Sequence, residues 1–175
     1  AAEEEIALRV LRRAIAAVGG SEQPVSLAKL ESIASALRVA RAEPAKWTLA
    51  RAMITASGQS LIIEREPGRE PLPNLELRAG DQACWDGRFW VKVGADAGAG
   101  AIAVRPLGEA AAREFRQQGA ATTHAPMRAA GMVPSFWRED RLLAVPSLGF
   151  WSDPNCRSVL EAQFIWRKMV GSAPV

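Results

Sequence analysis

The sequence has few residues of the kinds that build metal sites, disulfide frameworks or membrane spans. His124 is the only histidine, which excludes a site with several histidine ligands and makes any Ser-His-Asp or Cys-His arrangement depend on one loop residue. Cys84 and Cys156 lie far apart without a Cys-x-x-Cys motif, so we expect two reduced thiols, with a disulfide as the alternative. No run approaches the roughly 20 apolar residues that span a bilayer. We therefore expect neither a metal site nor a membrane partner.

Motifs of catalysis and targeting are also missing. There is no glycine-rich phosphate loop; the segment ITASGQS lacks the lysine and the following helix pattern. Glu64 and Glu66 lie two residues apart on a predicted strand and can act as an acid and a base, but a solvated strand face explains them as well. Glu139 and Asp140 are a second pair of carboxylates. The N-terminal AAEEEIALRV starts with acids, unlike a secretory signal, so we expect a cytoplasmic protein. We assign no catalytic residue.

Positive charge is present in excess, and most of it is arginine. The 22 cations and 19 anions give a net charge of +3 and a pI of about 9.3, and only Lys29, Lys46, Lys92 and Lys168 are lysines. Arginine suits bidentate phosphate contacts and stacking on flat rings. A GC-rich genome enriches arginine as well, so composition by itself is compatible with a nucleic-acid partner and does not prove one.

The hydrophobic periodicity predicts an α+β protein. Residues 3–18 follow a helical stripe through Ile6, Leu11 and Ile15, Gly19-Gly20 ends it, and a second helix runs from Ser26 to about Leu37. Later segments read as strands and short helices, and 159–166 reads as a strand or a helix. We predict strands at 47–54, 60–66, 101–105 and 141–145, and helices at 109–118 and 126–133. The predicted domains are a helical hairpin (1–45), an antiparallel β segment (46–97) and a small C-terminal α+β domain (98–175), with a boundary near GADAGAG.

The stretch QACWDGRFWVKV predicts a β-hairpin. Asp-Gly between β-forming residues is a strong signal for a two-residue turn. With Asp86 and Gly87 as the loop, Trp85 lies opposite Arg88, and alternation places Cys84, Phe89, Val91 and Val93 on a core face. Trp85, Arg88, Trp90 and Lys92 then form an exposed face of cations and rings.

Several segments together resemble the C-terminal part of tRNA(Ile)-lysidine synthetase. The helical hairpin ALRVLRRAIAAVGG…LAKLESIASALR precedes KWTLARAMITASGQSLIIEREPGR, the order that follows the catalytic domain in that family. LPNLELRAGDQACWDGRFWV resembles the next β segment, with its W-D-G-R-F run, and PMRAAGMVPSFWREDRLLAVPSLGFW resembles the small C-terminal domain. The resemblance covers most of the chain.

The resemblance implies a part of the enzyme without its reaction centre. The family's catalytic domain begins with a pyrophosphate-binding S-G-G-x-D-S motif, which this sequence lacks. In that family ATP activates the wobble cytidine of isoleucine tRNA, and lysine then displaces AMP. ATP and Mg²⁺ would belong to an upstream catalytic domain, and this chain would need no cofactor of its own. It would help to hold the tRNA.

A tRNA partner gives the basic and aromatic residues a use, because cations neutralise phosphates and rings stack on unpaired bases. The predicted nucleic-acid-binding residues are Arg9, Arg12, Arg13, Trp85, Arg88, Trp90, Lys92, Arg138 and Arg141. Two alternatives do not need RNA: Arg12 and Arg13 can belong to an ordinary solvated helix face, and Arg88 and Trp85 can form a cross-strand cation–π pair. A second hypothesis is a protein-interaction or dimerisation module, in which the six tryptophans form an apolar contact surface. A third is a small hydrolase using Glu64 and Glu66.

Overall fold

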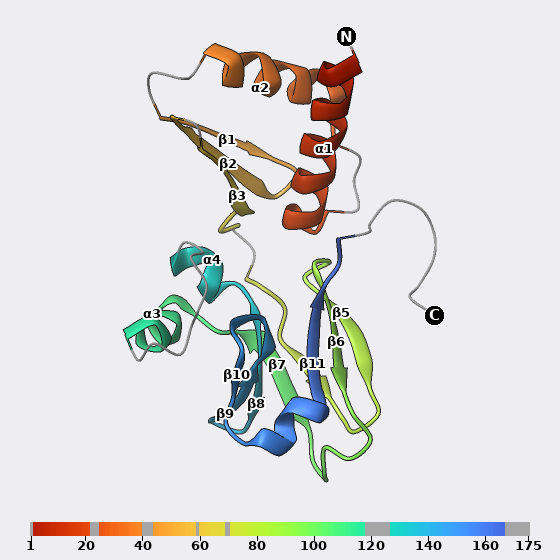
Figure 1. Cartoon of the computed structure of the whole chain (residues 1–175). Helices are drawn as coiled ribbons and strands as arrows, with labels where there is room; N and C mark the ends of the chain where they lie inside the picture. The colour runs from red at the N-terminus through yellow and green to blue at the C-terminus, as the bar shows by residue number, and fades with distance from the viewer. Residues whose placement is uncertain are drawn as a thin grey trace. The chain divides into compact units, whose positions relative to one another are not determined.

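The chain is an α+β protein, as the sequence predicts, and it divides into two compact units. The computed structural model describes residues 2–21, 25–39, 44–58, 60–68, 71–117 and 127–166. Unit 1 comprises residues 1–68 with 165–175, and unit 2 comprises residues 69–164 (Figure 1). Unit 1 contains the helical hairpin and the first β-strands, and unit 2 contains two antiparallel sheets with two short helices.

The two helices of unit 1 confirm the helical hairpin. Helix α1 (Ala2–Gly19) and helix α2 (Leu27–Val39) agree with the predicted ranges within two residues. The apolar stripe of α1 is only partly buried: Leu11 and Ile15 lie in the core, whereas Ile6 and Val10 are 61% and 58% exposed. The first half of the stripe therefore faces solvent in unit 1.

The segment predicted as one strand at 47–54 is two strands joined by a tight turn. Strand β1 (Ala45–Leu49) pairs with β2 (Ala52–Ser57), which pairs in turn with β3 (Ser60–Arg65). The turn residues Ala50 and Arg51 have φ of 49° and 63°, a backbone region that costs about 1–2 kcal/mol per L-residue. The turn contains no glycine or asparagine, so nothing in the sequence interrupts the strand-like pattern of residues 47–54. The prediction of a single strand there was wrong.

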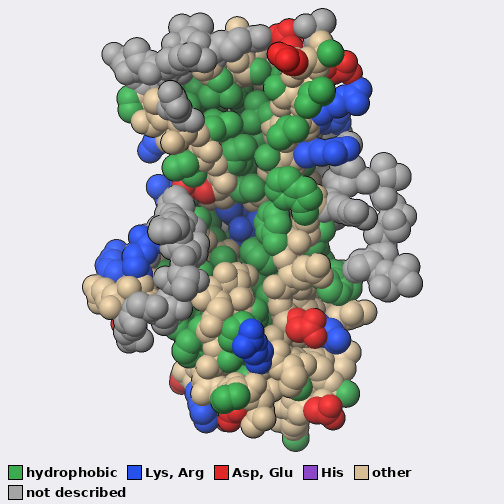
Figure 2. Space-filling model, viewed as in Figure 1, with side chains coloured by type: hydrophobic (Ala, Val, Ile, Leu, Met, Phe, Trp, Pro, Cys, Tyr) green, Lys and Arg blue, Asp and Glu red, His purple; other side chains and the backbone are tan. Residues whose placement is uncertain are grey.

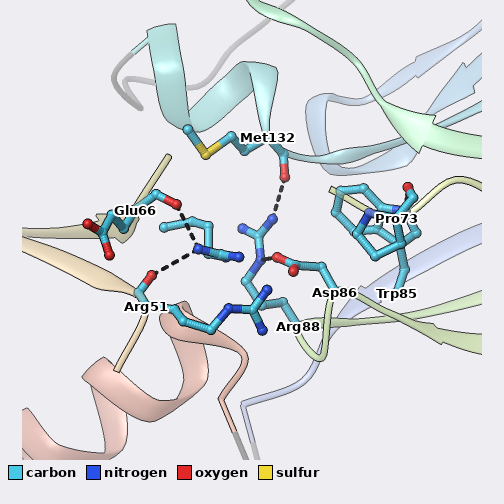
Figure 3. Close-up of polar contacts among 8 residues, drawn as sticks. Arg51, Glu66, Pro73, Trp85, Asp86, Arg88 and Met132 are labelled. Carbon is cyan, nitrogen blue, oxygen red and sulfur yellow. Dashed lines mark hydrogen bonds and ion pairs between the residues drawn. The ribbon is translucent and has the colours of Figure 1, made fainter. Parts of the chain in front are cut away.

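Contacts from neighbouring segments hold this turn in place. The Arg51 carbonyl accepts hydrogen bonds from the Glu66 N–H (2.9 Å) and from the Arg65 guanidinium (3.2 Å), which also donates to the Glu66 carbonyl (2.6 Å; Figure 3). The end of α1 packs directly on the turn, since a Cβ added at Gly19 would lie 1.9 Å from the Ala50 oxygen. Only glycine fits there without movement of the backbone.

Unit 2 contains two antiparallel sheets that share a hydrophobic core, and a second apolar cluster around Phe115 and Leu148. The larger sheet has the order β10-β9-β8-β7-β4 and the smaller has the order β11-β6-β5. The core draws on both sheets, with Trp85, Val91 and Leu160 from the smaller one and Val104 and Phe136 from the larger. The strands are β4 (Leu75–Leu77), β5 (Gln82–Trp85), β6 (Phe89–Val93), β7 (Ile102–Pro106), β8 (Pro134–Arg138), β9 (Arg141–Val145), β10 (Phe150–Trp151) and β11 (Leu160–Phe164). Figure 1 shows the two layers with α3 (Glu109–Gln117) and α4 (Met127–Gly131) beside the larger one.

Long-range pairing settles the features that periodicity left open. Residues 160–164 are a strand, because β11 pairs with β6 along its whole length and completes the smaller sheet. The glycine-rich segment 94–100 connects β6 to β7 inside unit 2, so the division between units falls after Gly68 and differs from the expected one near GADAGAG. Strands β4, β8 and β10 were not expected from the sequence; β8, in the middle of the larger sheet, contains a proline at its first residue.

Candidate nucleic-acid interface

The hairpin at Asp86-Gly87 forms, but with a register one residue different from the prediction. Asp86 and Gly87 have φ of 49° and 66°, and the Arg88 N–H donates to the Trp85 carbonyl at 3.0 Å, as in a two-residue turn. The ladder, however, begins with Trp85 opposite Phe89, so Arg88 is an extra residue between turn and strand. A slip of one residue moves one strand's side chains to the opposite face of the sheet.

The predicted exposed face is therefore wrong for Trp85 and Arg88, and the predicted core face is wrong for Cys84. Trp85 is 0% and Arg88 5% exposed, while Cys84 is exposed. Trp90 is half-buried, with its indole N–H 3.3 Å from the Gln82 side-chain oxygen. Lys92 is exposed and lies 3.5 Å from the Glu161 carboxylate, its partner on β11. Phe89, Val91 and Val93 lie in the core, as predicted.

Arg88 is held inside unit 2 by hydrogen bonds and rings. Its Nε lies 2.6 Å from Asp86 Oδ2, and its Nη2 donates to the Met132 carbonyl at 2.6 Å (Figure 3). The guanidinium carbon is 5.6 Å from the Trp85 ring centroid and 5.3 Å from that of Phe89. The Trp85 indole N–H donates to the Pro73 carbonyl at 2.9 Å. Arg88 thus connects the β5–β6 hairpin to the segment before β8, and a role on the surface does not fit its position.

The basic residues of α1 lie on its solvent side and differ in how they are paired. Arg9 is 2.6 Å from Glu5 one turn earlier, and both side chains are well exposed. Arg13 is exposed and Arg12 half-buried, and within the described part of the chain neither forms an ion pair. Their positive charges are therefore available to an anionic partner, whereas that of Arg9 is already partly neutralised.

The third predicted group flanks the β8–β9 turn. Arg138 and Arg141 are opposite each other across the Glu139-Asp140 turn. Arg141 is exposed, but Arg138 is half-buried and donates to the Ala97 carbonyl at 2.9 Å. The neighbouring Trp137 is half-buried under the guanidinium of Arg105, whose carbon lies 4.2 Å from the ring centroid. Arg105 is not among the residues predicted from the sequence. The alternation of β7, with Ile102 and Val104 inward, is the signal that places Arg105 on the outer face.

The net positive charge belongs to one unit. Unit 1 contains 11 Lys and Arg residues and 8 Asp and Glu residues, whereas unit 2 contains 11 of each. Long-range attraction of a polyanion therefore originates mainly in unit 1, which includes α1. Figure 2 shows Lys and Arg side chains along one side of α1, next to the acids of its first turn.

The carboxylates of Glu64 and Glu66, considered for catalysis, do not form a solvated pair. Glu64 is 7% exposed, which corrects the expectation of a solvated face, and Glu66 is half-buried just beyond the end of β3. His124 lies outside the described residues. The described ranges contain no group of three or more His, Cys, Asp or Glu side chains arranged to hold a metal ion, and both cysteines are free. No helix in these ranges is long and apolar enough to cross a membrane.

Unit 1 also has an apolar groove, of about 480 Å³, between α1, α2 and β3. Val10 and Leu61 line it and are 58% and 45% exposed. In Figure 2 hydrophobic side chains cover much of the surface between α1 and the sheet. The tryptophans do not form such a surface, because Trp166, at 61%, is the only exposed one of the six.

Comparisons with known proteins give no relative. No protein-family model matches the chain, and no curated protein or solved structure matches it.

Proposed function

We propose that this chain binds tRNA as the non-catalytic C-terminal part of a tRNA(Ile)-lysidine synthetase, a cytoplasmic ligase of tRNA modification. ATP and Mg²⁺ are used by an upstream catalytic domain, which is the second partner of the chain. The proposal rests on the sequence resemblance in the helical hairpin, the W-D-G-R-F hairpin and the last third of the chain. It also rests on a basic surface that can meet a phosphate backbone.

The observation that carries the proposal is the basic side of α1. Arg12 and Arg13 are adjacent, reach solvent and have no carboxylate partner among the described residues. They belong to the unit that contains the whole excess of positive charge. Guanidinium groups bind phosphate oxygens bidentately, and each neutralised phosphate releases counterions. Arg88 and Trp85, both buried, do not contribute to this surface.

The test is tRNA binding as a function of salt. Affinity for fluorescently labelled isoleucine tRNA is measured by anisotropy between 50 and 200 mM KCl, for the wild type and for the Arg12→Ala/Arg13→Ala variant. Losing two phosphate contacts flattens the slope of log K against log [salt] by about two units. The affinity at 50 mM KCl divided by the affinity at 200 mM KCl therefore becomes smaller by about threefold for each phosphate contact that is lost.

The matched control removes two charges without changing the net charge. Glu5→Gln/Arg9→Gln eliminates the ion pair on the same helix face, and its salt slope should stay within half a unit of the wild type. Absence of tRNA binding at 50 mM KCl contradicts the proposal, as does tight binding that does not depend on salt.

A protein-interaction module is the second candidate, and the apolar groove of unit 1 favours it. Exposed Val10 and Leu61 are residues that an interface would bury. If the groove mediates self-association, sedimentation velocity between 5 and 200 µM shows a concentration-dependent dimer that Leu61→Glu abolishes. A dimer together with no tRNA binding supports this candidate over the first.

A further inference from the structure

A stacked arginine lies on the outer face of the larger sheet in unit 2. In β7 the side chains of Ile102 and Val104 enter the core, whereas Arg105 points the other way and is half-buried. Arg105 is opposite Ser135 on β8, and Trp137 is opposite Ala103, so Arg105 and Trp137 are diagonal neighbours on one face. The guanidinium carbon lies 4.2 Å from the centroid of the indole, a distance typical of stacking.

Two hydrogen bonds hold the indole under the guanidinium. The Trp137 N–H donates to the Ser135 hydroxyl at 2.7 Å, and that hydroxyl donates to the backbone carbonyl of Arg105 at 2.7 Å. Ser135 is fully buried, so the hydroxyl at the centre of this chain of hydrogen bonds is shielded from water. Ser135 on β8 therefore orients the ring and also connects it to the backbone of Arg105 on β7.

Arg105 differs from Arg88 in its exposure and pairing, and from Arg157 in its shorter distance to the ring. Arg88 is buried and paired with Asp86, and Arg157 is 5.1 Å from the Trp151 centroid. Arg105 is partly exposed and forms no ion pair within the described residues. Glu76, which lies opposite Ala103 on β4, is a carboxylate of the same ladder and makes no ion pair with Arg105 in the described structure. The guanidinium thus lies over the indole, and no carboxylate in the described ranges pairs with it.

We propose that Arg105, whose guanidinium carbon lies 4.2 Å over the Trp137 ring centroid, is a stacking site for an unpaired RNA base. A guanidinium is planar and delocalised, and RNA-binding proteins stack splayed bases on such planes as well as on aromatic rings. Because Trp137 already orients Arg105, little side-chain freedom is lost when a base stacks on it. This inference rests on the proposed tRNA function and adds a contact to the base where α1 supplies contacts to phosphates.

The test separates the flat shape of Arg105 from its charge. Arg105→Lys keeps the charge but removes the plane. Binding of the full chain is measured with a single-stranded oligoadenylate of ten nucleotides and with a strand of the same length that contains abasic residues. We expect Arg105→Lys to weaken oligoadenylate binding by about tenfold, with an unchanged salt slope and unchanged affinity for the abasic strand. Arg157→Lys is the matched control and should alter binding by less than about twofold.

A second measurement uses the wild-type chain, so it does not depend on how well a variant folds. The NMR signal of the Arg105 Nε–Hε group, assigned from the Arg105→Lys spectrum, should shift on addition of oligoadenylate and not on addition of the abasic strand. Equal affinities of the wild type and Arg105→Lys for oligoadenylate overturn the inference, as does an equal loss on both strands.

The two proposals fail in different ways. Salt-dependent tRNA binding with no effect of Arg105→Lys overturns the stacking site and leaves the tRNA function standing. Binding to neither tRNA nor oligoadenylate overturns both.

Discussion

Replacing Arg88 is expected to destabilise unit 2 severely, because it breaks the buried ion pair with Asp86. The side chains of Arg88 and Asp86 are 6% and 0% exposed, with 2.6 Å between the bonded nitrogen and oxygen. Breaking a buried ion pair by removing one partner costs about 3–5 kcal/mol. Unit 2 has 96 residues, and a domain of that size has a total stability of roughly 5–14 kcal/mol. Arg88→Ala therefore removes a large fraction of it.

A double-mutant cycle separates the ion pair from packing. Arg88→Met keeps the aliphatic volume beside Trp85 and Phe89, and Asp86→Asn keeps a residue that tolerates φ of 49°. We expect the double variant to be more stable than the sum of the single effects by about 1–3 kcal/mol, because each single substitution already breaks the Asp86–Arg88 ion pair and the double variant loses it only once.

The assay is urea unfolding followed by circular dichroism and by tryptophan fluorescence, which reports on buried Trp85. A loss below about 1 kcal/mol for Arg88→Met would refute the buried ion pair. The tRNA measurement gives a second check: under conditions where Arg88→Met is folded, its salt slope should equal that of the wild type. A slope lower by one unit would mean that Arg88 contacts a phosphate after all.

Two further predictions test the close packing of α1 and the register of the hairpin. Gly19→Ala should destabilise unit 1 by about 1–3 kcal/mol, since the added methyl group would lie 1.9 Å from the Ala50 oxygen. Without that contact, a Gly→Ala substitution in a helix stabilises the protein by about 0.5–1 kcal/mol. A melting temperature above that of the wild type would therefore refute the close approach of Gly19 to Ala50. In the native protein, a thiol reagent should label Cys84 rapidly, as measured by mass spectrometry of the Cys156→Ser variant. Protection of Cys84 to the level of a buried thiol contradicts the observed register and supports the two-residue loop.

Local signals were sufficient for the elements that short-range physics controls. The stripe through Leu11 and Ile15 and the acids of the first turn predict α1, and Asp86-Gly87 predicts a turn, because these effects act within a few residues of the chain. The hydrophobic periodicity of the helical and strand-like segments also predicts the α+β class correctly. For the candidate site, the sequence places Arg12 and Arg13 on the face of α1 opposite its apolar stripe, and in the structure Arg13 is exposed and Arg12 is half-buried.

The turn at Ala50-Arg51 and the register of the β5–β6 hairpin, which were not predicted, depend on contacts between residues far apart in the sequence. The Ala50-Arg51 turn has no glycine, and it is held by Arg65 from β3 and packed against the end of α1. Arg88 donates hydrogen bonds to Asp86 and to Met132, which lies 44 residues away. In the β5–β6 hairpin, Arg88 is an extra residue between the turn and the first paired residues, Trp85 and Phe89. Alternation along a strand predicts faces only when the register is known, and a shift of one residue reverses them. The residue pattern along the chain thus specifies the helices, the strands and most of their turns. Strand pairing and contacts of buried charges between distant parts of the chain decide which side chains remain on the surface.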